Sequence, residues 1–372
     1  GCGKGMVINM GESKILLEEW SPVCNIQAFV ERTDTSCYFY LWVKPGMEDA
    51  VVKSCWICNV SAAPGELDVE SMRQGIAPAM PVQYVLHDAG GMELDADKLK
   101  IVWFEEGNAA ALLSEEELLC VIPCWSGYQG FHGYSRYADG MAPCAWGLAD
   151  ALGTIRPRVA RSQAFWDWFE YEPEYWKITQ KTHMDALENF FGPCQNYYAI
   201  DNEEFPPKAL VRGGRDGVVY GITAGVSLIP MPGIELYDSQ DYRTDRRMEL
   251  GFAVVEQHEG LCNQMFSYLA AASAYPCQEE TFFAHGHTVP YNRIEGFAAV
   301  LFVNPRMVPG LEMPDYKPCM EDPVNLLWVV PITEEEYRFA MEHDIGETLG
   351  NVRGALAKVH IFDGKPKFSV RA

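Results

Sequence analysis

The first half of the chain carries its apolar residues in short runs separated by polar turns, a pattern typical of β-strands. Residues 26–31 and 37–43 flank a polar turn at 32–36, which predicts a hairpin with a short loop. Neighbouring side chains of a strand point to opposite faces, and both sets in residues 37–43 are apolar. Both faces should therefore be covered, and this strand is predicted to be central in its sheet.

More strands and one short helix are predicted before the middle of the chain. Residues 51–60 should form a strand, and residues 99–105 and 109–113 a second hairpin. The four residues from Ser114 match a capping box, the arrangement that often starts a helix. We therefore expect a short helix there, which must end before Pro123 because proline cannot continue it.

The second half mixes helical and strand patterns. Phe165, Trp168 and Phe169 recur at helical spacing, which predicts a helix over residues 164–171, preceded by a connecting segment at 148–161. Such aromatic residues are usually buried along an amphipathic helix, but several exposed together would mark an interaction site. Apolar, β-branched runs predict strands at 217–223, 226–229, 248–255, 297–303 and 326–330.

Two further helices are predicted in the C-terminal half. The first covers residues 261–274 and should stop before Pro276. The second starts at Thr333, where the sequence Thr-Glu-Glu-Glu is a capping box. Its buried stripe is predicted to consist of Tyr337, Ala340 and Met341.

The chain as a whole is predicted to be an α+β protein in two parts, each with a β-sheet flanked by helices. Its 372 residues exceed what one hydrophobic core usually serves. The pattern changes near residue 155, so the expected parts are 1–155, a strand-rich α+β module, and 156–372. The apolar fraction of 48% indicates a folded globular protein.

The charge of the chain restricts its possible partners. Its formal net charge of −23 repels phosphate backbones and anionic lipid surfaces, so neither nucleic acid nor membrane is an expected partner. Residues 1–20 contain no apolar core of a signal peptide, and no run is long enough to span a bilayer. A cytoplasmic location is expected. The acidity would steer a basic partner, although it would also simply keep a protein soluble.

Cysteines and histidines offer the only candidate metal chemistry. Cys55 and Cys58 have the spacing of zinc and redox sites, but alternation along a strand would put their thiols on opposite faces. His285 and His287 would share a face of an extended segment, yet the sequence indicates no third ligand. We therefore predict no metal, no cofactor and no catalytic residues, and expect most cysteines to be buried apolar side chains.

Four sequence blocks stand out in the second half of the chain. They are RRMEL at 246–250, HGHTVP at 285–290, AVLF at 299–302 and WVVPITEEE at 328–336. In sequence and in order they resemble bacterial members of the Suppressor-of-fused family, and the similarity covers about residues 195–350. The resemblance implies that the second part is a Suppressor-of-fused-like α+β domain that binds proteins. In the eukaryotic namesake a peptide is clamped as an added strand.

The resemblance implies a binding function without catalysis. Bacterial members are thought to include immunity proteins that neutralise toxins, so the predicted partner is a protein, most simply a basic toxin domain. The motif residues that the resemblance assigns to partner binding are Gly286, His287, Thr288, Pro290, Trp328 and Pro331. A loop with this sequence can also serve only to fix a turn. The alternative function is a metal-dependent or Cys/His-based hydrolase that uses His285 and His287. The identity of the partner and the oligomeric state stay open.

Overall fold

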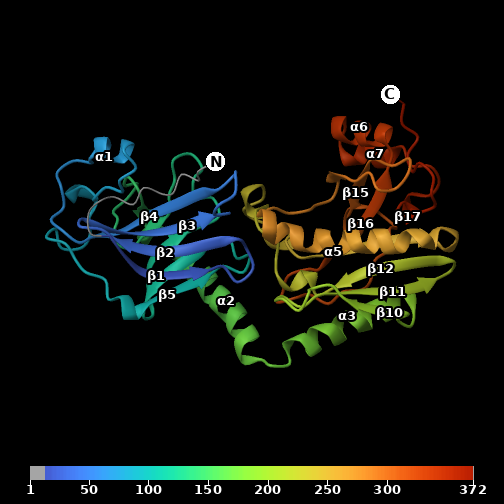
Figure 1. Cartoon of the computed structure of the whole chain (residues 1–372), viewed down its shortest axis with the longest axis horizontal. Helices are drawn as coiled ribbons and strands as arrows, with labels where there is room; N and C mark the ends of the chain where they lie inside the picture. The colour runs from blue at the N-terminus through green and yellow to red at the C-terminus, as the bar shows by residue number, and fades with distance from the viewer. Residues whose placement is uncertain (1–12, 372) are drawn as a thin grey trace. The chain divides into compact units, whose positions relative to one another are not determined.

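The computed structural model describes residues 13–371, and the chain divides into two units, Gly1–Tyr171 and Glu172–Ala372. Each unit has its own sheets and helices (Figure 1), so the predicted α+β class in two parts is confirmed. The units divide after α2 (Leu152–Tyr171), and the expected boundary near residue 155 falls within this helix. The prediction for the first twelve residues lies outside the described part of the chain.

The first sheet of unit 1 is a four-stranded antiparallel meander. Its strands follow the chain in the order β1 (Lys14–Trp20), β2 (Ile26–Arg32), β3 (Ser36–Val43) and β4 (Val51–Asn59). The predicted hairpin at β2 and β3 and the predicted strand at β4 are therefore confirmed. β3 is an inner strand, and seven of its eight residues are buried because both of its faces are covered.

The second sheet of unit 1 corrects one prediction. Its strands are β5 (Leu99–Trp103), β6 (Ala110–Ser114), β7 (Glu117–Ile122), β8 (Tyr134–Ser135) and β9 (Trp146–Gly147). The helix predicted after Ser114 is wrong, because the chain turns at Glu115, whose φ of 54° is left-handed, and returns as β7. The apolar run that follows the capping-box sequence is continuous, and such a run fits a buried strand better than one face of a helix.

One long helix packs on the second sheet of unit 1. α2 starts at Leu152, twelve residues before the predicted helix, because Ile155 and Val159 continue its buried stripe. Phe165 is buried as well, and the indole Nε1 of Trp166 donates a hydrogen bond to the carbonyl of Trp103 on β5 at 2.9 Å. The aromatic run therefore serves mainly to hold the helix on the sheet. The remaining helices of unit 1 are α1 (Val69–Arg73), η1 (Val82–Tyr84), η2 (Ala96–Lys98) and η3 (Ala149–Ala151).

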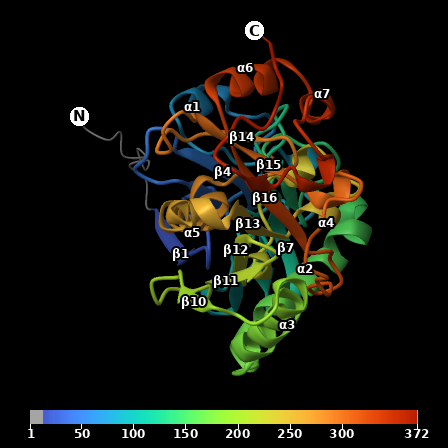
Figure 2. The same ribbon diagram turned by 90° about the vertical axis from the view of Figure 1, so that its right-hand side faces the viewer.

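Unit 2 is built on one mixed sheet of eight strands. The order is β10-β11-β12-β13-β16-β15-β14, with β17 paired to β13, and Figure 2 shows these strands one after another. β13 and β16 run parallel, whereas the other neighbours along this path are antiparallel. The bounds are β10 (Asn196–Ala199), β11 (Ala209–Arg215), β12 (Val218–Ala224), β13 (Met248–Val255), β14 (Thr288–Pro290), β15 (Ala299–Val303), β16 (Asn325–Ile332) and β17 (Ile361–Phe362).

Helices cover both faces of this sheet. Leu187 and Phe191 of α3 (Tyr175–Phe191) pack with the residues of one face, and Met265 and Leu269 of α5 (Cys262–Glu279) with those of the other. Alternate residues of β16 belong to the two cores, so the strand is buried on both sides. The other helices of unit 2 are α4 (Tyr242–Asp245), α6 (Glu334–Glu342), α7 (Ile345–Gly350), η4 (Val226–Leu228), η5 (Ile234–Leu236), η6 (Glu256–Leu261), η7 (Pro305–Met307) and η8 (Leu356–Lys358).

Three details of unit 2 differ from the predictions. Residues 226–228 form η4 rather than a strand, because Gly225 adopts a φ of 101° and turns the chain out of the sheet. α5 contains Pro276 and ends three residues later, since the buried stripe that holds it continues through this proline. The predicted capping box of α6 is confirmed, but Met341 is exposed, and the buried side of the helix is centred on Glu336.

Candidate functional site

The four sequence blocks lie side by side in the sheet of unit 2. RRMEL leads into β13, WVVPI belongs to β16, AVLF to β15, and HGHTVP ends in β14. These four strands are consecutive neighbours in the sheet. Segments up to 90 residues apart in the sequence thus form one continuous half of the sheet, which ends at β14 (Figure 2).

The arginines of the first block belong to a buried ionic cluster. Asp322 accepts from the Nε atoms of Arg243 at 2.6 Å and of Arg247 at 2.8 Å, and its Oδ2 lies 2.7 Å from Nη2 of Arg246. Arg246, Arg247 and Asp322 are all buried. Burial would raise the pKa of Asp322, but the neighbouring guanidinium groups outweigh it and lower the pKa. The RRMEL block therefore has a structural role in joining β13 to the chain before β16.

Glu249 of the same block is a second buried anchor. Its carboxylate accepts hydrogen bonds from the Thr223 hydroxyl and the Ser227 N–H, each at 2.9 Å. His183 lies nearby, with its Nε2 3.4 Å from the Ser227 hydroxyl and 3.8 Å from Glu249. Ser227 and Glu249 thus both approach the same nitrogen, Nε2 of His183. In a hydrolase triad the serine and the carboxylate contact different imidazole nitrogens, so this geometry does not prepare Ser227 as a nucleophile. Glu249 and its two hydrogen-bond donors, Thr223 and Ser227, instead close the turn between β12 and β13.

Two asparagines connect this cluster to His285. The Nδ2 of Asn304 donates to Oδ1 of Asn325 at 3.0 Å, and Nδ2 of Asn325 donates to the carbonyl of Arg247 at 3.0 Å. The backbone N–H of Asn304 donates to Nδ1 of His285 at 3.0 Å. Burial lowers the pKa of His285, which favours the neutral ring that such an acceptor requires. His285 thus fixes a turn at this end of β15.

The loop before β14 is shaped by Gly286 and His287. Gly286 has a φ of 87°, and its N–H donates to the carbonyl of Phe302 at 2.8 Å. His287 accepts from the N–H of Ala284 at 3.2 Å through Nδ1, and burial lowers its pKa. Both histidines of the HGHTVP block therefore use one ring nitrogen to hold the loop. Within residues 13–371, no three His, Cys, Asp or Glu side chains are grouped to hold a metal ion.

The Cys-x-x-Cys pair of unit 1 is divided between two other cysteines. Cys55 has Cys120 beside it, and Cys58 has Cys37, its partner in the pairing of β3 with β4. Burial and the Cys120 contact raise the pKa of Cys55, and the Cys37 contact together with burial raises that of Cys58. Raised pKa values keep thiols protonated, whereas metal ligands and redox nucleophiles need the thiolate. The predicted role of these cysteines as small apolar side chains matches this environment.

Trp328 and Pro331 lie inside β16 and are buried, and Trp328 is 0% exposed. The indole Nε1 of Trp328 donates to the carbonyl of Glu312 at 2.9 Å, and its ring centroid is 4.7 Å from that of His360. Neither side chain can touch a partner while unit 2 is folded, so they can act only by supporting the sheet. Gly286, His287, Thr288 and Pro290 lie at or beside the edge strand.

The two edges of the sheet differ in what they offer to another chain. β14 has three residues, includes Pro290, and lies against α6. β10 has four residues, all exposed, with Tyr198 at 42%. The Ile200 N–H donates a hydrogen bond to the carbonyl of Lys208, next to β11. Backbone N–H groups point alternately to the two sides of a strand, so those of Tyr197 and Ala199 point away from β11. β10 is thus the more open edge, because proline and a covering helix are ways in which proteins block pairing.

Sequence reasoning missed β10. Its sequence NYYA is short, but the two tyrosines are typical of strands, and Pro193 and Pro206 bound the segment. That signal could have placed a strand there. Its position at an edge could not be read from the sequence, because it depends on which strands pair.

Gly286→Ala should destabilise unit 2 more than the same change at Gly296. Both glycines have a φ near 87°, but a Cβ at Gly286 would lie 2.9 Å from Cβ of Ile345, whereas one at Gly296 would meet nothing within 4 Å. We expect a loss of roughly 1 kcal/mol at Gly296 from the backbone conformation alone, and of about 2 to 3 kcal/mol at Gly286. Urea unfolding of both variants measures the difference. Equal losses would show that the loop at Gly286 and Ile345 of α7 move apart without a loss of stability.

A mixed sheet with helices on both faces and two unequal edges defines unit 2 as an α+β domain. The sequence model of the family described as Suppressor of fused protein (SUFU) matches residues 209–363. Unit 2 therefore carries a Suppressor-of-fused-like domain, as the four blocks indicated. The match begins at β11 and includes every strand of the sheet except β10.

Comparisons with solved structures and with curated proteins add little to this family match. A solved structure described as the Sufu-Fu complex crystal structure is similar at 12% sequence identity, over 51% of this chain and 91% of its own, with a TM-score of 0.36. A search of curated proteins found no match. Of the helices that the structure describes, none has the length and apolar character to cross a membrane.

Proposed function

We propose that this chain is a protein-binding module without catalytic activity, and that it acts as an immunity protein that neutralises a basic toxin domain. The observation that carries the proposal is the open edge at β10 of the Suppressor-of-fused-like unit. A partner segment can add to such an edge as a further strand, because backbone hydrogen bonds supply affinity with little demand on side-chain identity.

The surroundings of β10 favour a basic partner. The strand runs directly into an acidic loop in which Glu203 and Glu204 are exposed. The whole chain has a net charge of −23, which would accelerate the approach of a cationic surface. Strand addition at β10 thus combines a sequence-tolerant contact with electrostatic steering.

The alternative hydrolase is less well supported. It requires His285 and His287 as a pair, but each of them accepts a backbone N–H through Nδ1. The buried carboxylates of Glu249 and Asp322 are already occupied by hydrogen bonds and ion pairs within unit 2. The polar groups of this unit are better explained as supports for the sheet than as a reaction centre.

Binding through β10 predicts that Ala199→Pro weakens the complex by about tenfold or more, because proline removes an outward N–H and adds a ring at the edge. The partner is first captured from host cells with the tagged chain and identified by mass spectrometry. Its affinity for each variant is then measured with purified proteins at low and high salt. Association should slow as salt rises, since screening weakens steering.

Thr288→Pro is the matched control, because it removes an outward N–H from the opposite edge, β14, which holds the motif residues. Both variants should keep the melting temperature within a few degrees. A complex lost in Thr288→Pro but kept in Ala199→Pro would move the binding edge to β14. Failure to capture any protein, or a captured protein whose toxicity in cells is not relieved by co-expression of this chain, would contradict the proposed function.

A further inference from the structure

Unit 2 carries a small aromatic surface that the proposed function does not use. It consists of Leu236, Tyr237, Phe282 and His287, and we call it the Tyr237 patch. Tyr237 directly follows η5, and Phe282 follows the end of α5. All four residues belong to unit 2, so the patch is a property of this unit alone.

Two segments far apart in the sequence are held together beneath the patch. The Phe283 N–H donates a hydrogen bond to the sulfur of Met231 at 3.4 Å, and the Phe283 side chain is buried. Its ring stacks on that of Phe302 of β15 at a centroid distance of 4.6 Å. The chain after η4 and the chain after α5 therefore lie side by side on a buried base.

The rings of the patch contact each other but remain open to water. Phe282 lies 5.5 Å from Tyr237 between ring centroids, at an interplanar angle of 65°, and it also lies 5.5 Å from His287 of the HGHTVP block. Tyr237 is nevertheless 82% exposed, and Leu236 is 38% exposed. A ring this exposed has at least one face open to another molecule, and grouped apolar side chains at a surface are typical of interaction sites.

The two segments that form the patch carry negative charge only. Neither residues 233–242 nor residues 276–287 contain a lysine or an arginine, whereas together they contain five carboxylates. Burial lowers the pKa of His287, so its ring adds no positive charge near neutral pH. The five carboxylates are those of Glu235, Asp238, Asp241, Glu279 and Glu280.

The cations near the patch are engaged by other groups of unit 2. Arg243, Arg246 and Arg247 all contact Asp322, and the last two are buried. Arg306 interacts with Asp245. The exposed rim of the Tyr237 patch, which includes Asp238 and Asp241, is consequently acidic.

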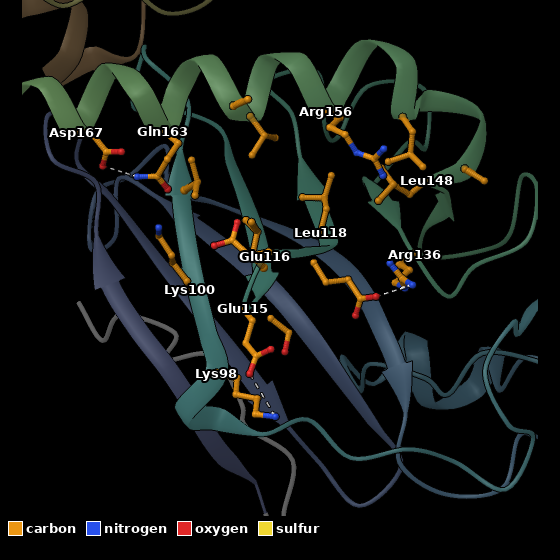
Figure 3. Close-up of a pocket in the computed structure, with 18 of the residues that line it drawn as sticks. Lys98, Lys100, Glu115, Glu116, Leu118, Arg136, Leu148, Arg156, Gln163 and Asp167 are labelled. Carbon is orange, nitrogen blue, oxygen red and sulfur yellow. Dashed lines mark hydrogen bonds and ion pairs between the residues drawn. The ribbon is translucent and has the colours of Figure 1, made fainter.

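A groove in unit 1 differs in this respect. It lies between α2 and the strands β5, β6 and β7 (Figure 3). Four basic and four acidic side chains line it, and Figure 3 shows Lys98 beside Glu115. The charges of the groove balance and select no ligand, whereas those of the Tyr237 patch favour a cation.

We infer that the Tyr237 patch binds an arginine side chain presented by a protein segment. The guanidinium group would lie over the Tyr237 ring, whose face attracts cations, and pair with Asp238 or Asp241 at the rim. Arginine suits this site better than lysine, because its planar group stacks on rings and binds a carboxylate through two hydrogen bonds. The inference rests on the proposed function only for the basic character of the partner, and it adds a contact to the one at β10.

The test uses the full chain and a short fluorescent peptide in which arginines are separated by glycine and alanine. Its dissociation constant is measured by anisotropy at physiological ionic strength. Tyr237→Ala should weaken binding by about fivefold, whereas Tyr237→Phe should leave it nearly unchanged, because only the first removes the ring. Replacement of the arginines by lysines should weaken binding by about threefold.

Matched variants separate the patch from the general acidity of the chain. Asp238→Asn combined with Asp241→Asn should weaken binding by about fivefold. Glu48→Gln combined with Glu66→Gln removes as many exposed charges from unit 1 and should have little effect. Tyr128→Ala removes a tyrosine of unit 1 that is 59% exposed and should have none. All of these side chains are exposed, so each variant should keep the melting temperature of the wild type.

A benzophenone group placed beside the arginines locates the bound peptide. Cross-links mapped by mass spectrometry should concentrate in residues 233–242 and 276–287. Cross-links spread evenly over both units, or equal binding to the wild type and to Tyr237→Ala, would overturn the inference.

The partner captured through β10 distinguishes this inference from the proposed function. A partner that binds the wild type and Tyr237→Ala equally, but loses affinity for Ala199→Pro, would overturn the inference and leave the proposed function intact. Arginine peptides that bind at the patch, in a chain that captures no protein partner, would support the inference and contradict the proposed function.

Discussion

Asp322→Asn is expected to lower the free energy of unfolding of unit 2 by roughly 3 to 5 kcal/mol. The substitution keeps the shape of the side chain but removes a carboxylate that contacts Arg243, Arg246 and Arg247 at once. Arg246 and Arg247 would then retain their charges in the protein interior without this counter-ion. Removal of one partner from a buried ion pair costs more than the pair contributes, because the remaining charge is poorly solvated.

Glu334→Gln is the matched control for Asp322→Asn. It makes the same kind of change in the pair between Glu334 and Arg338, which is exposed on α6, and should cost less than about 0.5 kcal/mol. Urea unfolding at neutral pH measures both variants. A loss below about 1 kcal/mol for Asp322→Asn would mean that water or other groups compensate the arginines, and that the RRMEL block does not depend on this aspartate.

Acidification is expected to destabilise unit 2 through His360. The ring is 1% exposed, and burial lowers its pKa from 6.5 to about 4, although Glu312, with Oε1 3.5 Å from Nε2, acts in the opposite direction. Lys367 and Arg215 lower the pKa further. Between about pH 6.5 and pH 4, His360 of the unfolded chain binds a proton that His360 of the folded chain does not. The free energy of unfolding therefore falls as the pH drops from about 6.5 towards 4.

The expected size of the effect follows from the shift of the His360 pKa. The full contribution is roughly 3 kcal/mol, of which about 2 kcal/mol should be lost between about pH 7.5 and pH 5. His360→Phe keeps an aromatic ring beside Trp328 but cannot titrate, so its stability should fall less over this range. Urea unfolding at both pH values measures the free energy of unfolding of the wild type and of the variant. Subtracting one from the other removes the contribution of the carboxylates, because these titrate in both proteins.

His343→Phe provides the comparison at an exposed histidine. His343 lies at the end of α6, where its side chain is accessible to water, so this variant shows what the exchange of a histidine for phenylalanine does at an exposed position. Parallel curves for the wild type and His360→Phe would contradict the buried, neutral state of His360. The pair Trp328 and His360 would then stabilise the sheet without making it sensitive to pH.

The elements that the sequence predicted well are those whose signals are local. β3 and β13 are marked by apolar runs that are buried on both faces, and the capping box of α6 depends on Thr333 and Glu336, which are three residues apart. The order of the four family blocks along the chain was likewise sufficient to identify the Suppressor-of-fused-like unit. Each of these signals is contained in a few neighbouring residues or in their order, so no knowledge of pairing was needed.

The failed predictions show where local signals compete with tertiary contacts. Ser114 begins a sequence that fits a capping box, yet the residues that follow it pair with β6 as the strand β7. Glu115 adopts a left-handed conformation and turns the chain into this hairpin. Pro276 should have ended α5, but the apolar side of the helix remains packed on the sheet through that residue. Packing decided both cases, because burial of a whole strand or stripe outweighs a preference at one position.

The sequence by itself determined the α+β class, the acidic character and the family of the second unit. Only the tertiary structure decided which edges and grooves are open. Sequence reasoning assigned Trp328 to a binding site, whereas its strand lies in the middle of the sheet, and it gave no sign that β10 would be an edge. Lys100 and Arg156 are 56 positions apart and meet at one groove because α2 packs over β5. Composition and spacing record local preference, but exposure depends on contacts between segments far apart in the chain.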